Sequence, residues 1–432
     1  MKKKILELDK KYLWHPFTPI SRNAPIPIAS AKNEYLNDID GKKYIDLISS
    51  WWVNIHGHCN EYIYNRIIDQ SKRLEQVLFA GFTHEPAVKL AKELNDILPK
   101  KMSKVFYSDN GSTSVEIALK IAIQYWFNQG KKKNKFVSFD GGYHGDTFGA
   151  MSVGFSTGFY QPFEDLLFKS FSVPFPESWN GNNEIEKNEN IALDEIDRIL
   201  NDHHSEIAAV ILEPLIQGAG GMKICRKEFL EQAVKKFKSA GVIVIFDEVM
   251  TAFGRTGKMF ALDYLEKTEP DIICLAKSLT GGYIPLAATV FNEKIFNAFV
   301  SSDINKSFLH GHSFTANPIA CEAALASLDL FKINKTLEKI ECLNKVHISC
   351  LEEVSSKLDV SKIRCLGSIA AFDLNNIQKK YGSDKSNNLK NKFIENGLLL
   401  RPLGNTIYLM PPYCISPNKL NDCYNKIIQI LN

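Results

Sequence analysis

The chain has 432 residues, of which 45% are hydrophobic and 23% are charged, and its formal net charge is +3. This composition is typical of a globular protein with a large core, and it excludes an intrinsically disordered chain. Lys and Arg are scattered among Asp and Glu, so no basic surface for nucleic acid is expected. No apolar stretch reaches the ~20 residues that a membrane helix needs, and we expect a cytoplasmic protein that does not contact a membrane.

Cysteine and histidine give no sign of a metal site. The nine cysteines contain no CxxC pair, which argues against a zinc site, and their odd number argues against a disulfide framework. Histidines occur in two pairs, His56 with His58 and His310 with His312, but no carboxylate or cysteine stands at a matching spacing. We therefore interpret them as loop or core residues and expect no metal.

Residues 1–55 are irregular and rich in proline, with a hairpin-like stretch through Asp40-Gly41, and we expect an arm and part of a small domain. From about residue 86, helices alternate with short apolar strands. This alternation predicts an α/β fold with a mainly parallel sheet covered by helices, and a large domain at residues 56–320. The expected elements are helices at 86–98, 113–127 and 227–238, and strands at 105–107, 136–139, 208–212, 242–246, 272–275 and 286–291.

Two stretches depart from this alternation. Residues 177–190 are rich in Asn and Glu and are expected to form an exposed loop or insertion. The pattern changes again at Asn317, and it predicts a smaller α+β domain at 321–432. Its expected elements are long helices through residue 358, a β stretch at 363–374, another helix, short strands near 398–400 and 406–410, and a final helix.

An aspartate and a lysine follow two successive apolar strands. Asp247 comes directly after the strand 242–246, and Lys277 follows the strand 272–275 at the start of a Gly-rich loop. A lysine beside a buried strand is expected to have its amine partnered or used chemically, because desolvating an ammonium costs several kcal/mol. The pair suggests a pyridoxal phosphate site, where the lysine forms a Schiff base with the cofactor aldehyde and the aspartate keeps the pyridine nitrogen protonated. The alternative for Asp247 is a buried salt bridge with an arginine such as Arg255.

The segment that begins at Asn110 connects a strand to a helix and has the features of an anion-binding site. Gly111 permits close approach of a ligand, and the free N–H groups of the first helical turn and the Ser112 hydroxyl can donate to a phosphate. The alternative is a plain helix cap, with Thr113 and Glu116 at the spacing of a capping box.

Other loops at the expected edge of the sheet carry further candidates. Tyr143 stands between glycines after a strand, where its ring can lie on a planar cofactor or fill a Gly-rich turn. Glu213 follows the strand 208–212 and could pair with an arginine of the site or accept from backbone donors. Ser313 precedes a helix expected near Pro318, where phosphate binding and capping are equally open.

The segments around Asp247 and Lys277 resemble the class III aminotransferases of the fold-type I pyridoxal phosphate enzymes, over nearly the whole chain. They read Phe246-Asp247-Glu248-Val249, Phe253-Gly254-Arg255-Thr256-Gly257 and Leu275-Ala276-Lys277-Ser278-Leu279-Thr280-Gly281-Gly282. Four more segments resemble the biotin-pathway branch of this class. They are Trp14-His15-Pro16-Phe17-Thr18, Ser50-Trp51-Trp52, the run from Gly142 to Ser152, and Arg401-Pro402 with Tyr408-Leu409-Met410-Pro411-Pro412-Tyr413.

That branch converts 8-amino-7-oxononanoate to 7,8-diaminononanoate with pyridoxal 5'-phosphate. The resemblance therefore implies this reaction, with S-adenosylmethionine as the expected amino donor and lysine as the alternative. An aminomutase or another class III aminotransferase keeps the same fold and cofactor, and a non-enzymatic cofactor-binding protein is the remaining hypothesis.

By position, the resemblance makes Lys277 the Schiff-base lysine and Asp247 the partner of the ring nitrogen. It assigns the cofactor phosphate to Gly111 and Ser112. It also implies a homodimer with shared active sites, in which Ser313 binds the phosphate at the site of the other subunit.

The resemblance also implies a set of substrate contacts. These are Phe17, Trp51, Trp52, Tyr143, Asp146, Gly311 and Arg401. Tyr143 would also stack near the cofactor and take part in catalysis, Asp146 would contact the donor's amino group, and Arg401 would bind the carboxylate of the oxo acid. Without the family resemblance, the favoured interpretation of Arg401 is that it forms an ion pair at the surface.

Two positions depart from the family pattern. Many members have tyrosine where this chain has Phe17, so the ring is kept and a hydroxyl facing the substrates is lost. The family commonly has proline and threonine where this chain has His312 and Ser313, a mild change because the hydroxyl is kept.

Overall fold

The computed structural model describes residues 1–432 except 22–23, 155–159 and 380–381. Its central element is a seven-stranded sheet in the order β4-β12-β11-β10-β7-β5-β6. The strands are β4 (Met102–Ser108), β5 (Lys135–Phe139), β6 (Phe171–Val173), β7 (Ile207–Leu212), β10 (Ile243–Asp247), β11 (Ile272–Leu275) and β12 (Ala287–Asn292). In this sheet β12 alone runs opposite to the other six strands, so the predicted mainly parallel sheet is confirmed.

Helices cover both faces of this sheet. Successive residues of β10 alternate between two cores, because side chains in a strand point to opposite faces. Val244 and Phe246 pack in the core that includes residues of α7 (Ile185–His203) and α8 (Lys227–Ser239), whereas Ile243 and Ile245 pack in the core of α5 (Gly111–Asn128). Every residue of β7, β10, β11 and β12 is buried, as expected for strands covered on both sides.

Further helices and short pieces complete the large unit. They are α2 (Ser49–Trp52), α3 (Glu61–Ser71), α4 (Glu85–Ile97), α6 (Phe148–Ser152), α9 (Glu293–Asn297) and α10 (Pro318–Ile333), with the hairpin β8 (Ile216–Gln217) and β9 (Lys223–Ile224) and short 3₁₀ helices at Gln161–Leu166, Ala261–Tyr264, Lys277–Thr280 and Ile304–Lys306. Among the described residues, no helix is both long and apolar enough to cross a bilayer.

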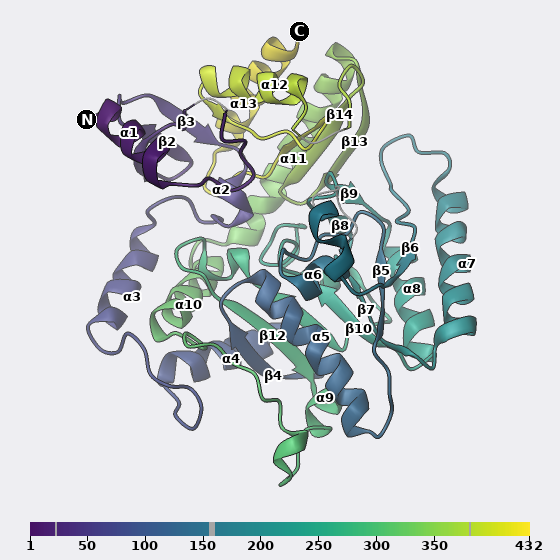
Figure 1. The fold of residues 1–432 in the computed structure, drawn as a ribbon. Helices are drawn as coiled ribbons and strands as arrows, with labels where there is room; N and C mark the ends of the chain where they lie inside the picture. The colour runs from purple at the N-terminus through teal and green to yellow at the C-terminus, as the bar shows by residue number, and fades with distance from the viewer. Residues whose placement is uncertain (22–23, 155–159, 380–381) are drawn as a thin grey trace.

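The two ends of the chain meet in a smaller α+β unit, drawn at the top of Figure 1. Its first sheet is β13 (Val360–Leu366), β14 (Ile369–Leu374) and β16 (Thr406–Leu409), and its second is β1 (Ile28–Lys32), β2 (Tyr35–Asp38), β3 (Lys43–Asp46) and β15 (Leu398–Leu399). Its helices are α11 (Thr336–Lys357), α12 (Asp384–Glu395) and α13 (Pro417–Leu431). Because β15 pairs with β3, the N-terminal segment is hydrogen-bonded to the C-terminal unit.

Two local predictions are wrong. The first residues form a helix, α1 (Lys2–Tyr12), because they are mostly good helix formers and two lysines occupy its last turn. The exposed loop predicted at 177–190 ends early, since α7 begins at Ile185 and Glu189 is buried against Arg226 with an Nε–Oε1 distance of 2.8 Å. In both cases the prediction followed the polar or Pro-rich composition around the segment and missed its local helical propensity.

Candidate active site

Asp247 and Lys277 lie at the same edge of the sheet. Asp247 ends β10 and pairs in register with Cys274 of the parallel strand β11, and Lys277 follows the end of β11. Parallel strands present their carboxyl ends at one edge, where α/β folds bind ligands. The neighbouring strands therefore bring the predicted acid and lysine to the same edge of the sheet.

The Asp247 carboxylate is 3% exposed and is held by two donors on the protein side. One oxygen lies 2.7 Å from Nδ1 of the buried His144, and the other accepts from the backbone N–H of Val249 at 3.1 Å. The alternative partner Arg255 is buried elsewhere, with its guanidinium 3.3 Å from the carbonyl oxygens of Trp52 and Pro411. The proposed salt bridge is therefore wrong, and His144 is the contact that the sequence reasoning missed.

Lys277 has an unusual backbone and an unusual environment. Its φ is +44°, a left-handed conformation that costs about 1 kcal/mol or more for a residue with a Cβ, and it starts the 3₁₀ turn Lys277–Thr280. Its Nζ lies 4.8 Å from the centre of the Trp52 ring. Burial lowers the pKa of the Lys277 amine, while the Asp247 and Glu213 carboxylates oppose that shift. A lowered pKa increases the fraction of neutral amine, the form that can take a proton.

The N-terminus of α5 has unused donors beside this edge. Asn110 caps the helix by accepting from the N–H of Thr113 at 3.1 Å, and the Thr113 hydroxyl closes a capping box with Asn110. The capping box predicted between Thr113 and Glu116 is wrong, because the Glu116 carboxylate binds another loop. Among the described residues, the N–H groups of Gly111 and Ser112 have no acceptor. A Cβ at Gly111 would lie 2.7 Å from a methyl group of Val249, which explains the glycine.

Glu213 is buried and bound by backbone donors, the second of its two alternatives. It accepts from the N–H of Tyr143 at 3.0 Å and from that of Gly218 at 2.9 Å. Burial raises the pKa of Glu213 to about 7, against the opposing effect of His144. The carboxylate fixes the backbone of the loop that carries Tyr143. Burial and the nearby Asp146 also raise the pKa of the Tyr143 hydroxyl, which therefore stays protonated.

Three residues that are far apart in the sequence form an aromatic and cationic cluster. The Phe17 and Trp51 rings meet edge to face with centres 5.4 Å apart, and the Arg401 guanidinium carbon lies 4.8 Å from the Trp51 ring centre. Next to Trp51, the indole N–H of Trp52 donates to the Tyr408 hydroxyl at 3.0 Å. The predicted substrate contacts from the arm and the C-terminal unit are therefore adjacent.

Strained backbone presents the two tryptophans. Ser49, Ser50 and Trp52 have φ values of +51°, +61° and +66°, which disfavour residues other than glycine. The buried Ser49 hydroxyl donates to the Met410 carbonyl at 2.7 Å and holds this turn against the C-terminal unit. Such conformations persist only where the surroundings enforce them, and they concentrate at functional sites.

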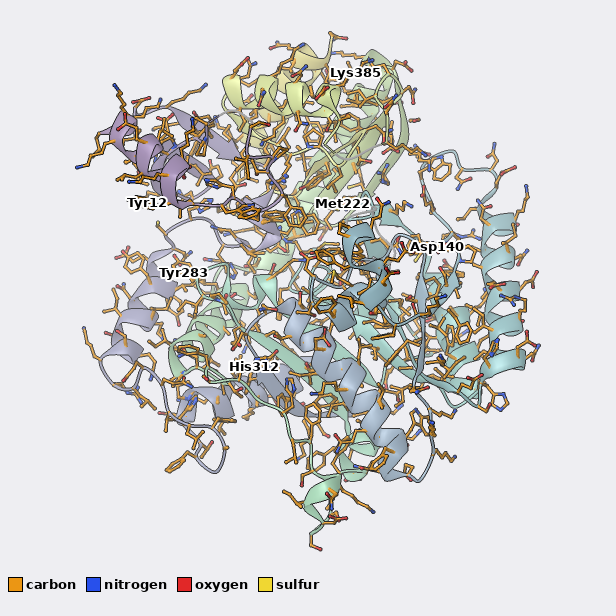
Figure 2. All side chains as sticks on the ribbon, in the orientation of Figure 1. Tyr12, Asp140, Met222, Tyr283, His312 and Lys385 are labelled. Atoms are coloured by element: carbon orange, nitrogen blue, oxygen red, sulfur yellow. The ribbon has the colours of Figure 1, made fainter. Side chains whose placement is uncertain are left out.

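Gly311 and Ser313 lie in an exposed loop between β12 and α10. The Ser313 carbonyl accepts from the Gln76 amide at 2.8 Å, and α10 is capped by Asn317, so the capping alternative for Ser313 is wrong. The neighbouring His312 lies near the start of α5, with its Nδ1 2.8 Å from an Asp109 carboxylate oxygen (Figure 2). Within the described part of the chain, no group of three or more potential ligands is arranged to hold a metal ion.

Known proteins resemble this chain over nearly its whole length. Residues 17–431 match the family described as aminotransferase class-III. The adenosylmethionine-8-amino-7-oxononanoate aminotransferase of Synechococcus elongatus is 47% identical over 98% of both chains, and that of Helicobacter pylori is 41% identical over 98% of this chain and 97% of its own.

Solved structures agree with these relatives. The crystal structure of adenosylmethionine-8-amino-7-oxononanoate aminotransferase from Methanocaldococcus jannaschii superposes with a TM-score of 0.91 at 37% identity over the full length of both chains. An amine transaminase from an uncultivated Pseudomonas species, solved in its PLP-bound form, gives a TM-score of 0.90 at 28% identity over 97% of this chain and 98% of its own.

The residues at the sheet edge fit pyridoxal 5'-phosphate. The unpaired N–H groups of Gly111 and Ser112 suit a phosphate, Asp247 is a buried acid suited to a protonated ring nitrogen, and the Lys277 amine has a lowered pKa. Asp247, Lys277 and the anion-binding N-terminus of α5 lie at one edge of the sheet. The family match covers 415 residues. The chain is a member of the class III aminotransferases, the fold-type I enzymes that use pyridoxal 5'-phosphate.

Proposed function

We propose that this enzyme converts 8-amino-7-oxononanoate to 7,8-diaminononanoate in biotin synthesis, with S-adenosylmethionine as the amino donor. The observation that carries the proposal is the Arg401–Trp51 contact beside Trp52, whose ring lies over the Lys277 amine. A planar guanidinium fixed on an indole can bind the carboxylate of an oxo acid through two parallel hydrogen bonds. The names of the relatives from Synechococcus and Helicobacter support the same substrates.

Each site residue then has a role. When bound, pyridoxal 5'-phosphate supplies an aldehyde for amines and a ring that accepts electrons. Gly111 and Ser112 donate to its phosphate, and Asp247, oriented by His144, holds the proton of its ring nitrogen. Lys277, as the neutral amine, takes a proton from the donor's Cα and later returns one to the product carbon.

The remaining residues bind the substrates. Trp51 and Trp52 exclude water from the apolar chain of the oxo acid, and Tyr143 lines the same space. Asp146 contacts the positively charged amino group of the donor. Phe17 covers the Trp51 ring without the hydroxyl that tyrosine would supply.

We further propose that the enzyme is a homodimer whose sites are shared. Four large apolar side chains near Ser313 are exposed, and isolated proteins rarely leave such a group uncovered. They are Leu78, Phe82, Leu309 and Phe314, which are 62–72% exposed in the single chain. A second copy covering them would bring Ser313 and Gly311 to the site of its partner, where the Ser313 hydroxyl donates to the cofactor phosphate.

The donor is tested by mixing the cofactor-loaded enzyme with S-adenosylmethionine or with lysine and recording the cofactor absorption. The spectrum should change with S-adenosylmethionine and return when 8-amino-7-oxononanoate is added. A spectral change with lysine but not with S-adenosylmethionine would refute the donor assignment. Failure of 8-amino-7-oxononanoate to restore the original spectrum would refute the acceptor assignment. The Lys277→Ala variant is the control, and native turnover by this variant would refute the whole proposal.

A further inference from the structure

Glu116 of α5 binds the start of α6, although the two helices are separated in sequence. Its Oε1 accepts from the backbone N–H groups of Gly149 at 2.8 Å and Ala150 at 3.1 Å, and also from the Thr147 hydroxyl. These are the first donors of α6, and its N-cap residue Thr147 makes no capping bond with its own side chain. Glu116 therefore supplies from another helix the acceptor that α6 lacks.

A second contact joins α5 to the same loop one turn earlier. The Ser112 hydroxyl accepts from the backbone N–H of Asp146 at 3.3 Å, and a Cβ at Gly145 would overlap that hydroxyl. Ser112 and Glu116 are four residues apart and thus point to the same side of α5. A serine hydroxyl has one donor and two acceptor positions, so Ser112 can hold Asp146 and still donate to a phosphate.

We propose that Glu116 is a positioning residue that holds Asp146 at a set distance from the phosphate-binding end of α5. The inference rests on the proposed function, in which Asp146 contacts the donor's amino group. The phosphate-binding N–H groups of Gly111 and Ser112 and the donor-binding Asp146 then belong to one rigid unit. This unit consists of the first two turns of α5 and the loop bound to them. Glu116 itself touches neither cofactor nor substrate, and it acts on donor binding through the loop.

The chain offers a matched control for this role. Glu231 of α8 also accepts from two successive backbone N–H groups of another segment, those of Glu266 at 2.5 Å and Lys267 at 3.2 Å. That contact lies on a part of the surface with none of the site residues. Removing the Glu231 carboxylate therefore shows how the loss of two such hydrogen bonds affects the enzyme at a place away from the proposed donor site.

The first test compares Glu116→Ala, Glu116→Gln and Glu231→Ala in the two half-reactions of the full-length, cofactor-loaded enzyme. Glu116→Ala should raise the donor concentration for half-maximal rate about 10-fold, because charge-assisted bonds to the loop are lost. The acceptor half-reaction should change by less than about twofold, since the proposed function assigns Asp146 a contact with the donor and none with the acceptor. Glu116→Gln keeps an acceptor oxygen and should recover part of the loss, and Glu231→Ala should alter neither half-reaction.

The second test measures amide hydrogen exchange in the full-length protein without cofactor. Glu116→Ala should speed exchange at residues 146–150, whereas Glu231→Ala should speed it only at 266–267. Equal losses in both half-reactions, or an unchanged donor response with faster exchange at 146–150, would overturn the positioning role. If the wild-type enzyme converts no donor at all, the proposed function fails as well, an outcome distinct from failure of the Glu116 variants alone.

Discussion

The sheet edge around Lys277 and the wall formed by Phe17, Trp51 and Arg401 are built in different ways. The edge depends on regular strands, because β10 and β11 are parallel neighbours and deliver Asp247 and Lys277 side by side. The wall depends on an arm, a strained turn and a C-terminal segment that meet only in the folded chain. We therefore propose that the chemistry common to the class belongs to the edge and that the wall selects the substrate.

The largest effect should come from the edge. Asp247→Asn keeps the shape but removes the negative charge that holds a ring proton, and we expect both half-reactions to slow by about 10³-fold. His144→Asn removes only the group that orients Asp247, so the loss should be about 10-fold. Rapid-mixing absorption measurements of each half-reaction separate the two. Equal losses in the two variants would contradict the role of His144 as a positioning residue.

A change in the wall should affect one substrate. Arg401→Ala should raise the KM for the oxo acid about 100-fold and leave the donor half-reaction near its native rate, because the charge-assisted bonds to a carboxylate are lost. Arg401→Lys keeps the charge without the planar guanidinium, so its KM for the oxo acid should lie between those of the wild type and Arg401→Ala. Steady-state kinetics with each substrate varied in turn provide the measurement. A loss shared by both substrates would contradict a role of Arg401 that is confined to the oxo acid.

A smaller effect should follow from restoring the hydroxyl that the wall lacks. Phe17→Tyr adds a donor and acceptor beside Trp51 without changing the ring contact, and we expect the KM for S-adenosylmethionine to fall about threefold. Phe17→Leu, which removes the ring, should raise it instead. A changed KM for lysine with an unchanged KM for S-adenosylmethionine would contradict the expected contact between this hydroxyl and S-adenosylmethionine.

The smallest effect should appear in the stability of the cofactor-free protein. Burial lowers the pKa of Lys277 from its ordinary value of 10.5, so the unfolded chain binds more protons between the folded pKa and 10.5. Stability should therefore rise with pH across this window through this group, and Lys277→Met should flatten that slope. Denaturant unfolding at several pH values tests this. An unchanged slope in the variant would show that Lys277 is solvated when no cofactor is bound.

Sequence reasoning works best at the edge. Apolar runs ending at Asp247 and before Lys277 predict strand ends, and their alternation with helices predicts a mainly parallel sheet. The partner of Asp247 was missed because His144 reaches it from another strand end, a contact that no local pattern records. Glu116 shows the same limit, since its spacing to Thr113 fits a local cap while its actual partners lie more than 30 residues away.

The wall was predicted from resemblance alone. Nothing in the composition of residues 49–52 indicates three positive φ angles, because those angles are enforced by contacts such as the bond from Ser49 to Met410. Likewise, α1 is a helix with no buried residue, so no hydrophobic pattern against a core marks it. Local propensity decides such a segment, and proline content farther along the chain obscured it.

The pairing of β15 with β3 has a consequence for the order in which the enzyme matures during its synthesis. A ribosome-bound chain that has emerged only as far as α10 already contains every strand of the large sheet, and hence Asp247 and Lys277. Leu398–Leu399, which pair with Ile45–Asp46, and Arg401 emerge only after α10, α11 and α12. Domains generally fold as units while the chain is being made. We therefore infer that the nascent protein forms the sheet edge with Asp247 and Lys277 first. The segment of Arg401, the residue that we propose binds the oxo acid, joins the fold only when β15 pairs with β3.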